Sequence, residues 1–251
     1  MYFIENLNFI KNFDYLFFLF FLSISYGVHL LYEPTKLLLD NNTKFKSYPI
    51  SKQYYIIKNF IKSLIMGIIF IALIFSFIPN MLNDKWNDSH NRLIGTFYVS
   101  NDLAGLFSVP NLPKSTKLHH LTTIFLFTII CSISTEEENI GRLIVVYTIF
   151  SCIPFMVNSY LGLRFFYSRD KELNEKQKKI NNIIDINRII AYYVYIICCI
   201  CNWTFHTYFL IKKINVNELS LEYYIYYGLL IPIINDDIIL LSWLKNNKLD
   251  L

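Results

Sequence analysis

Three ionisable side chains in apolar surroundings are the first candidates for chemistry. Asp102, beside Asn101, lies in the middle of one apolar segment, and His119 and His120 open the next, HHLTTIFLFTIICSIS. Ionisable groups at membrane depth are costly and usually face a protein interior or a water-filled cavity. Because a short turn separates the two segments, we expect Asp102 to pair with one of the histidines. Such a pair can act as general acid and base, or it can lock two helices together.

The adjacency of the two histidines argues against a metal site. On a helix, His119 and His120 lie about 100° apart, so they cannot both face the same neighbour. Two histidines share a metal on one helix face when they are four residues apart. We therefore predict no metal and no cofactor.

A polar stripe runs along a later apolar segment. Its members recur at steps of three and four residues, which places them on one helix face between isoleucines. In a bilayer this face should turn inward, either as hydrogen bonds between helices or as one wall of a cavity for a lipid headgroup or acyl chain. The stripe consists of Arg188, Tyr192, Tyr195, Cys199, Asn202 and His206.

Two other segments carry polar candidates next to prolines. Pro154 should kink its helix, because proline lacks a backbone N–H. Asn158 follows one turn later, and Arg164 comes at the end of the segment, where a guanidinium either binds a phosphate or extends to the membrane surface. Asp236 and Asp237 lie deep in the last apolar segment and are secondary candidates for the site.

The elements that must position these residues are helices. Of the 251 residues, 54% are hydrophobic, and they cluster into runs near the length of about 20 residues that crosses a membrane. We predict an all-α membrane protein with about seven transmembrane helices in one bundle. The first span and a basic loop occupy 1–54, the main helical bundle occupies 55–245, and a short tail occupies 246–251. The expected spans are 14–32, 60–79, 93–109, 119–134, 142–163, 187–210 and 222–244.

The distribution of basic residues predicts the topology. Of the 23 Lys and Arg, 6 fall on the N-terminal side of the seven spans and 17, including Lys58 and Lys62, on the other side. Cytoplasmic loops collect Lys and Arg, so we expect a lumenal or external N-terminus and a cytosolic C-terminus. The basic loops 33–59 and 164–186 should attract lipid headgroups or dock a protein partner. No basic groove with stacking aromatics points to nucleic acid.

The segment KLHHLTTIFLF, preceded by YVSNDLAGLF, resembles the central part of TLC-domain proteins, a family that includes ceramide synthases and regulators of lipid composition. IPFMVNSYLGLRFF and INRIIAYYVYI resemble the family's later segments, in the same order. The resemblance implies a helical bundle of the endoplasmic reticulum or a related membrane, with a cavity for a fatty-acyl or sphingoid chain. The matching positions are Asp102, His119, His120, Asn158, Arg164 and Arg188.

The chain also departs from the ceramide synthase pattern. Those enzymes carry a further His-Asp pair and other acids after the paired histidines, whereas VVYTIFSCIPF contains no His, Asp or Glu. We therefore expect a lipid-handling protein that binds an acyl chain or sphingolipid, without the full synthase site, and with membrane lipids as its partners. One alternative is an acyl-CoA-dependent N-acyltransferase, with His119 or His120 as base and Asp102 as its orienter. Another alternative is a membrane interaction protein or cargo receptor. The sequence also leaves open whether the chain forms a homo-oligomer.

Overall fold

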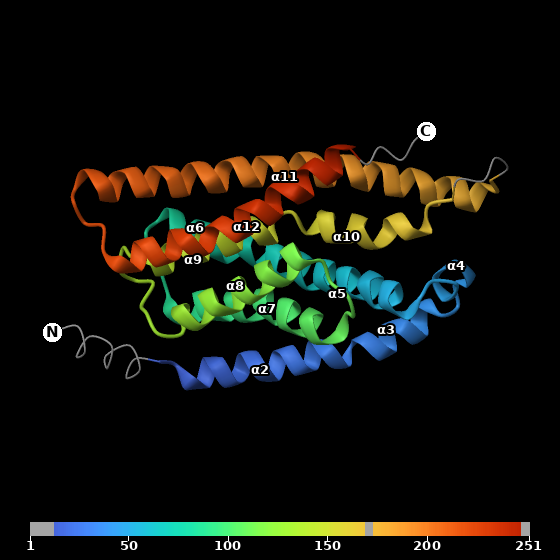
Figure 1. Cartoon of the computed structure of the whole chain (residues 1–251), viewed down its shortest axis with the longest axis horizontal. Coiled ribbons are helices and arrows are strands. Elements are labelled where there is room, and N and C mark those ends of the chain that lie inside the picture. The colour runs from blue at the N-terminus through green and yellow to red at the C-terminus, as the bar shows by residue number, and fades with distance from the viewer. Residues whose placement is uncertain (1–12, 169–172, 247–251) are drawn as a thin grey trace.

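A computed structural model describes residues 13–168 and 173–246, which form helices and no strand (Figure 1). The described part of the chain is all-α, as predicted. The helices are α2 (Tyr15–Leu30), α3 (Tyr32–Leu39), α4 (Thr43–Lys46), α5 (Ile50–Ala72), the π-helix η1 (Leu73–Phe77), α6 (Ile78–Leu82), α7 (Asp88–Ser108), α8 (Lys114–Ile130), α9 (Ile140–Cys152), α10 (Phe155–Leu163), the 3₁₀ helix η2 (Arg164–Phe166), α11 (Glu175–Asn215) and α12 (Leu221–Asn246).

Four helical stretches are long and apolar enough to cross a membrane, and five if a bent pair counts as one span. The four are Tyr15–Leu39, Ile50–Leu82, Glu175–Asn215 and Leu221–Asn246. The bent pair is α9 with α10, which meet at 41° where Pro154 precedes α10, so the predicted break is present. The expectation of about seven transmembrane helices is therefore too high.

The difference comes from α7 and α8, which were both expected to be spans. α8 has only 17 residues, and α7 begins with the polar run DSHNR and carries Asn101 and Asp102. Both helices pack inside the bundle: α7 contacts α2, α5, α8 and α9, and α8 also contacts α12. In Figure 1 they lie between α2 on one side and α11 and α12 on the other. Neighbouring helices, and not lipid, thus cover much of their surface.

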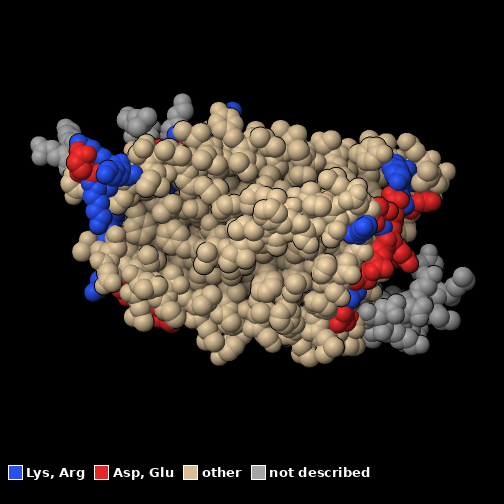
Figure 2. Space-filling view, turned by 180° about the vertical axis from the view of Figure 1, so that it is seen from behind, with Lys and Arg blue, Asp and Glu red and all other residues tan. Residues whose placement is uncertain are grey.

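Charged residues gather at the two ends of the molecule. Figure 2 shows blue and red surfaces at the ends and an uncharged belt between them. One end, which we call the basic end, contains α4, η2 and the start of α11, where Lys46, Lys176 and Lys178 are exposed. An uncharged belt between charged ends is the surface that a membrane-spanning bundle requires.

The opposite, acidic end contains the α8–α9 loop and the turn between α11 and α12. Lys212 Nζ lies 2.5 Å from Glu138 Oε1, and this hydrogen bond holds the pKa of Glu138 below its ordinary value. Lys213 pairs with Glu218 at 2.7 Å, and Arg142 pairs with Asp84 at 2.9 Å. The Lys212–Glu138 and Arg142–Asp84 pairs join separate segments of the acidic end, whereas Lys213–Glu218 lies within the turn between α11 and α12.

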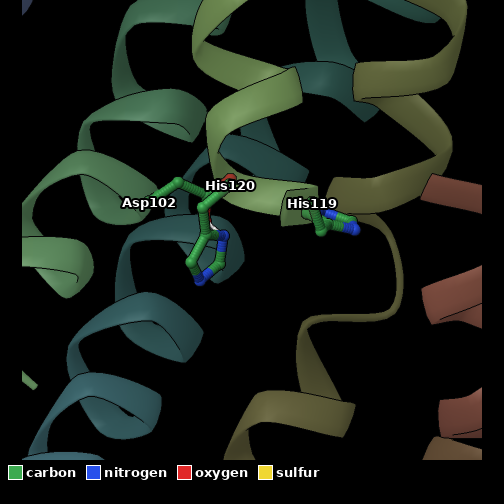
Figure 3. A group of neighbouring side chains, drawn as sticks. All are labelled: Asp102, His119 and His120. Atoms are coloured by element: carbon green, nitrogen blue, oxygen red, sulfur yellow. Dashed lines mark ion pairs between the residues drawn. The ribbon is translucent and has the colours of Figure 1, made fainter. Parts of the chain in front are cut away.

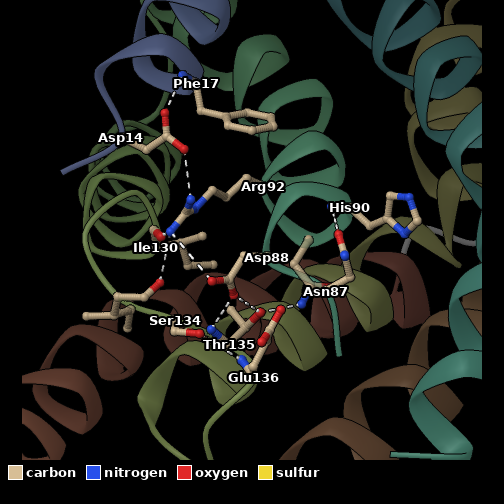
Figure 4. Close-up of polar contacts among 12 residues, drawn as sticks. Asp14, Phe17, Asn87, Asp88, His90, Arg92, Ile130, Ser134, Thr135 and Glu136 are labelled. Carbon is tan, nitrogen blue, oxygen red and sulfur yellow. Dashed lines mark hydrogen bonds and ion pairs between the residues drawn. The ribbon is translucent and has the colours of Figure 1, made fainter. Parts of the chain in front are cut away.

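A polar network near this end ties α2 and α7 to the end of α8 (Figure 4). Asp14 accepts a hydrogen bond from Phe17 N at the start of α2 and pairs with Arg92 of α7 at 2.8 Å. Arg92 also donates to the carbonyl of Ile130, and Asp88 accepts from the backbone and side chain of Thr135. Because Arg92 and Asp88 both lie on α7, this helix is held at one end by two other parts of the chain.

Close packing of α10 against α5 provides a stability test. A Cβ at Gly162 would lie 2.7 Å from the Phe60 ring, so Gly162→Ala must displace that ring. We expect the free energy of unfolding to fall by about 1–3 kcal/mol, as overpacking does in other cores. Thermal unfolding of the detergent-extracted protein measures this.

Gly228 is the matched control, because nothing lies within 4 Å of its Cβ position in α12. Gly228→Ala should leave stability unchanged or raise it by up to about 1 kcal/mol. Equal melting temperatures for the two variants would contradict the α5–α10 packing.

Candidate functional site

A cavity of about 280 Å³ lies between α5, α8, α10 and α12. This volume is near the lower limit of small-molecule sites, which run from about 300 to 1,000 Å³. Tyr98 of α7 and Tyr195 of α11 complete its wall. Its titratable and amide lining residues are Tyr55, Lys58, Asn59, Lys62, Tyr98, His119, His120, Asn158, Arg164, Tyr195, Asp236 and Asp237.

Helical periodicity explains why α5 and α12 each present several groups to the cavity. On α5, Tyr55, Lys58 and Lys62 follow at steps of three and four residues, which places them on one face. On α12, Asp236 and Trp243 lie two turns apart on one face of that helix, and both line the cavity. The break at Pro154 changes the direction of the chain before α10, and Asn158 of this helix also lines the cavity.

A buried chain of polar contacts forms the inner part of the site. Lys62 Nζ lies 2.5 Å from Asp102 Oδ1, and Thr123 donates to the other carboxylate oxygen at 2.9 Å. His120 Nδ1 lies 3.0 Å from the same Asp102 oxygen as Lys62, and its Nε2 lies 2.9 Å from Lys58 Nζ. Asp102 is fully buried, and Lys58, Lys62 and His120 are each less than 10% exposed.

The two histidines face different neighbours, as their spacing predicts (Figure 3). His120 turns toward Asp102 and α5, whereas His119 Nδ1 lies 3.4 Å from Asp236 of α12. The expected Asp–His pair is thus present for His120, and His119 has an acid from a distant part of the sequence. This acid, Asp236, lies outside the stretch VVYTIFSCIPF, where the ceramide synthase pattern has its further acids.

Asp237 has a separate set of partners. It accepts hydrogen bonds from Tyr195 at 2.7 Å and from Tyr147. The carboxylate is buried, so two hydroxyl donors compensate for part of its lost hydration. The two neighbouring acids of α12 therefore have distinct environments: Asp236 faces a histidine, and Asp237 lies between two tyrosines.

Arg164 lies at the start of η2, against aromatic rings. Its guanidinium carbon is 4.2 Å from the Trp243 ring centroid, 4.8 Å from that of Phe165 and 5.9 Å from that of Tyr55. Its Nε is buried without a hydrogen-bond partner. Stacking on aromatic faces, and not extension to the membrane surface alone, thus fixes this side chain.

The side chains of Asp102, His119 and His120 are close enough to hold a metal ion, with ligand atoms within 4.8 Å of one another. However, Lys62 Nζ contacts Asp102 Oδ1 and Lys58 Nζ contacts His120 Nε2, so an amine already lies against one potential ligand atom of each residue. A divalent cation would also face both lysines. The arrangement therefore favours an ion-pair and hydrogen-bond network over a metal centre.

The structure brings together most, but not all, of the predicted site residues. Asp102 pairs at the inner wall, and His119, His120, Asn158, Arg164, Tyr195, Asp236 and Asp237 line the cavity. The predicted stripe on α11 is buried or half-buried, so that face does turn inward. The remaining predicted residues do not line the cavity: Asn101, Arg188, Tyr192, Asn202 and His206.

Local contacts explain two of these exceptions. The amide of Asn101 donates to Phe97 O of its own helix. His206 Nε2 lies 2.8 Å from the Tyr226 hydroxyl, and its Nδ1 lies 2.8 Å from Asn202 O. The C-terminal part of the α11 stripe, Asn202 and His206, does not line the cavity. His206 instead connects α11 to α12 through Tyr226.

Sequence reasoning missed Lys58 and Lys62 as site residues. They were counted among the basic residues at the membrane surface because the second span was expected over 60–79, with Lys58 just before its start and Lys62 in its first turn. In the structure α5 begins at Ile50, and both lysines are buried, so that interpretation is wrong. Their spacing of four residues within the apolar run KNFIKSLIMGIIF is the signal that could have indicated one inward helix face.

The pair of Lys62 with Asp102 generates a test of the site's architecture. Asp102→Asn leaves the Lys62 ammonium buried without its carboxylate, and we expect a loss of about 3–5 kcal/mol in stability. Lys62→Met added to Asp102→Asn should recover much of this loss, because no unpaired buried charge then remains. Chemical unfolding of the four proteins of this cycle measures the coupling.

Asp40 is the control, because its pair with Lys36 is 3.6 Å long and partly exposed. Asp40→Asn should change stability by less than about 1 kcal/mol. If Asp102→Asn and Asp40→Asn behave alike, the buried pair does not organise the bundle.

No family model, no curated protein and no solved structure matches this chain. The similarity to TLC-domain proteins therefore stays a resemblance of motifs.

Proposed function

We propose that this chain is an integral membrane protein that handles lipids by holding part of an amphiphile in the cavity between α5, α8, α10 and α12. The observation that carries the proposal is the position of the cavity: charged side chains surround an open volume inside a bundle whose outer helices are long and apolar. Ionisable groups in such a place mark a ligand or ion pathway more often than a purely structural feature.

The entrance to the cavity supports a lipid as the ligand. Pro113, just before α8, and Ile239 of α12 both line the cavity and are exposed on the surface of the bundle. These two apolar side chains place the exposed edge of the cavity between the start of α8 and α12, where Ser115 and Thr116 also line it. An amphiphile can enter there with its polar part toward the charged wall while its chain stays in lipid.

The resemblance to TLC-domain proteins supports the same class of ligand, an acyl chain or a sphingolipid, and a host membrane such as the endoplasmic reticulum. The proposed orientation puts the basic end in the cytosol, because Lys and Arg favour that side. A role in lipid composition or trafficking follows from binding alone and requires no reaction.

The proposal predicts that lipid stays with the protein after gentle extraction. We expect mass spectrometry to find a stoichiometric amphiphile in the wild type. Ser115→Trp should lower its amount several-fold, because Ser115 lines the cavity on the first turn of α8 and an indole there fills the opening.

Ser23→Trp on the exposed face of α2 adds the same side chain far from the cavity and should retain the lipid. A wild-type protein free of lipid would refute the proposal, as would a Ser115→Trp protein that folds and binds as much as the wild type.

One observation favours a second function, acyl transfer from an acyl-CoA to an amine. His120 lies between Asp102 and Lys58, so a carboxylate can orient the ring, and its other nitrogen can receive a proton once Lys58 moves away. In this mechanism the amine nitrogen attacks the thioester carbonyl, and the C–S bond breaks so that CoA leaves as a thiolate. His120 accepts the proton released from the amine and returns it to that thiolate, which gives the amide and the free CoA thiol.

This alternative is tested by supplying acyl-CoA and a long-chain amine to the purified protein. Amide product that disappears in His120→Gln and persists in His206→Gln, a histidine outside the cavity, would establish transfer. Absence of product while lipid remains bound would leave lipid binding as the function.

A further inference from the structure

The guanidinium of Arg164 lacks an acceptor although it lines the cavity. Among residues 13–168 and 173–246, none forms an ion pair or a hydrogen bond with this group, and Nε is buried. A guanidinium carries five N–H donors in one plane. Burial of the Nε donor without an acceptor is costly, so at this atom the site is incomplete as it stands.

The aromatic rings around Arg164 hold the group in a defined plane. Trp243 and Phe165 lie within 5 Å of the guanidinium carbon, and Tyr55 is slightly farther. Stacking uses the faces of the guanidinium and leaves its N–H edges free. A fixed edge with parallel donors is the geometry that binds phosphate bidentately.

The cavity's own acids do not supply the missing acceptor. Asp236 pairs with His119, and Asp237 accepts hydrogen bonds from two tyrosines. On α12 these acids precede Trp243 by about two helical turns, roughly 10 Å along the axis. The carboxylates therefore belong to the inner part of the cavity, and Arg164 to its outer part.

Lys58 adds a second basic group to the same cavity. It lies one turn after Tyr55 on α5, and its Nζ contacts His120 and no carboxylate among the described residues. Lys62, one turn further, is already paired with Asp102. Two basic side chains without acidic partners among the described residues, Lys58 and Arg164, thus line the α5 and α10 side of the cavity.

We propose that Arg164, supported by Lys58, forms a subsite for the phosphate group of an amphiphile, with the guanidinium edge binding two phosphate oxygens. This inference rests on the proposed lipid function and names the chemical class of the headgroup. A tetrahedral phosphate presents oxygens in several directions, so it can contact the planar edge of Arg164 and the amine of Lys58 together. The acyl chain would leave through the opening between α8 and α12.

The test compares three probes on purified protein in detergent: short-chain phosphatidic acid, the diacylglycerol with the same chains, and inorganic phosphate. Native mass spectrometry measures binding. We expect the wild type to bind phosphatidic acid at least about ten-fold more tightly than diacylglycerol. Arg164→Gln should abolish this preference while diacylglycerol binding is unchanged, and Arg164→Lys should retain part of it, because lysine keeps the charge and loses the fork.

Arg188→Gln is the matched control, because Arg188 is also half-buried, also has a buried Nε without a partner, and does not line the cavity. It should retain the full preference. Equal losses in Arg164→Gln and Arg188→Gln would show a general effect of positive charge and overturn the subsite. If Arg164→Gln does not fold, the intermediate preference expected of Arg164→Lys decides in its place.

The remaining outcomes separate the two proposals. Equal binding of phosphatidic acid and diacylglycerol by the wild type would overturn the phosphate subsite and leave the lipid function standing. Binding of neither lipid would overturn both. Competition by inorganic phosphate would support a subsite that recognises the phosphate group alone. Phosphatidic acid binding without such competition would support a subsite that also needs the attached lipid.

Discussion

The ion pair between Lys62 and Asp102 is the constraint on which the rest of the bundle depends. Asp102 is fully buried, and a carboxylate in that position is tolerated only when opposite charge and hydrogen bonds surround it. Lys62 of α5 and Thr123 and His120 of α8 supply them. Three helices must therefore approach at one point and in one rotational setting, because each contributes a group to the same carboxylate. The cavity lies beside this point, which explains why its inner wall is polar.

The same constraint explains how α7 and α8 exist among longer apolar helices. Neither passes as a membrane span by length and composition, because α8 is short and α7 is polar. Their polar groups face each other and α5, and their outer surfaces meet α2, α9 and α12. Internal pairing thus removes the cost that lipid contact would impose. The network of Asp14 and Arg92 holds the other end of α7 and fixes its depth in the bundle.

Much of this arrangement follows from sequence patterns, and the rest depends on contacts that no local pattern contains. The periodic stripe on α11 correctly predicted its buried face, and Pro154 correctly predicted the break between α9 and α10. The lysines of α5 were misread because a lysine near the expected start of a span resembles an interfacial charge. Lys62 is paired with Asp102 of α7, 40 residues later, and Lys58 contacts His120 of α8, so their burial depends on how α5 packs against both helices. Likewise, nothing near His119 indicates that Asp236 approaches it.

The distribution of satisfied and unsatisfied groups argues for binding before catalysis. Both nitrogens of His120 already face polar neighbours, Asp102 and Lys58, so the ring can accept a substrate proton only after Lys58 moves away. Asp236 and Asp237 are also engaged. Arg164, in contrast, has no acceptor among the described residues, and its aromatic neighbours already set its orientation. A ligand gains most where the protein leaves a group unsatisfied and rigid, because little reorganisation opposes binding there. The anionic part of an amphiphile is therefore the element that completes this site.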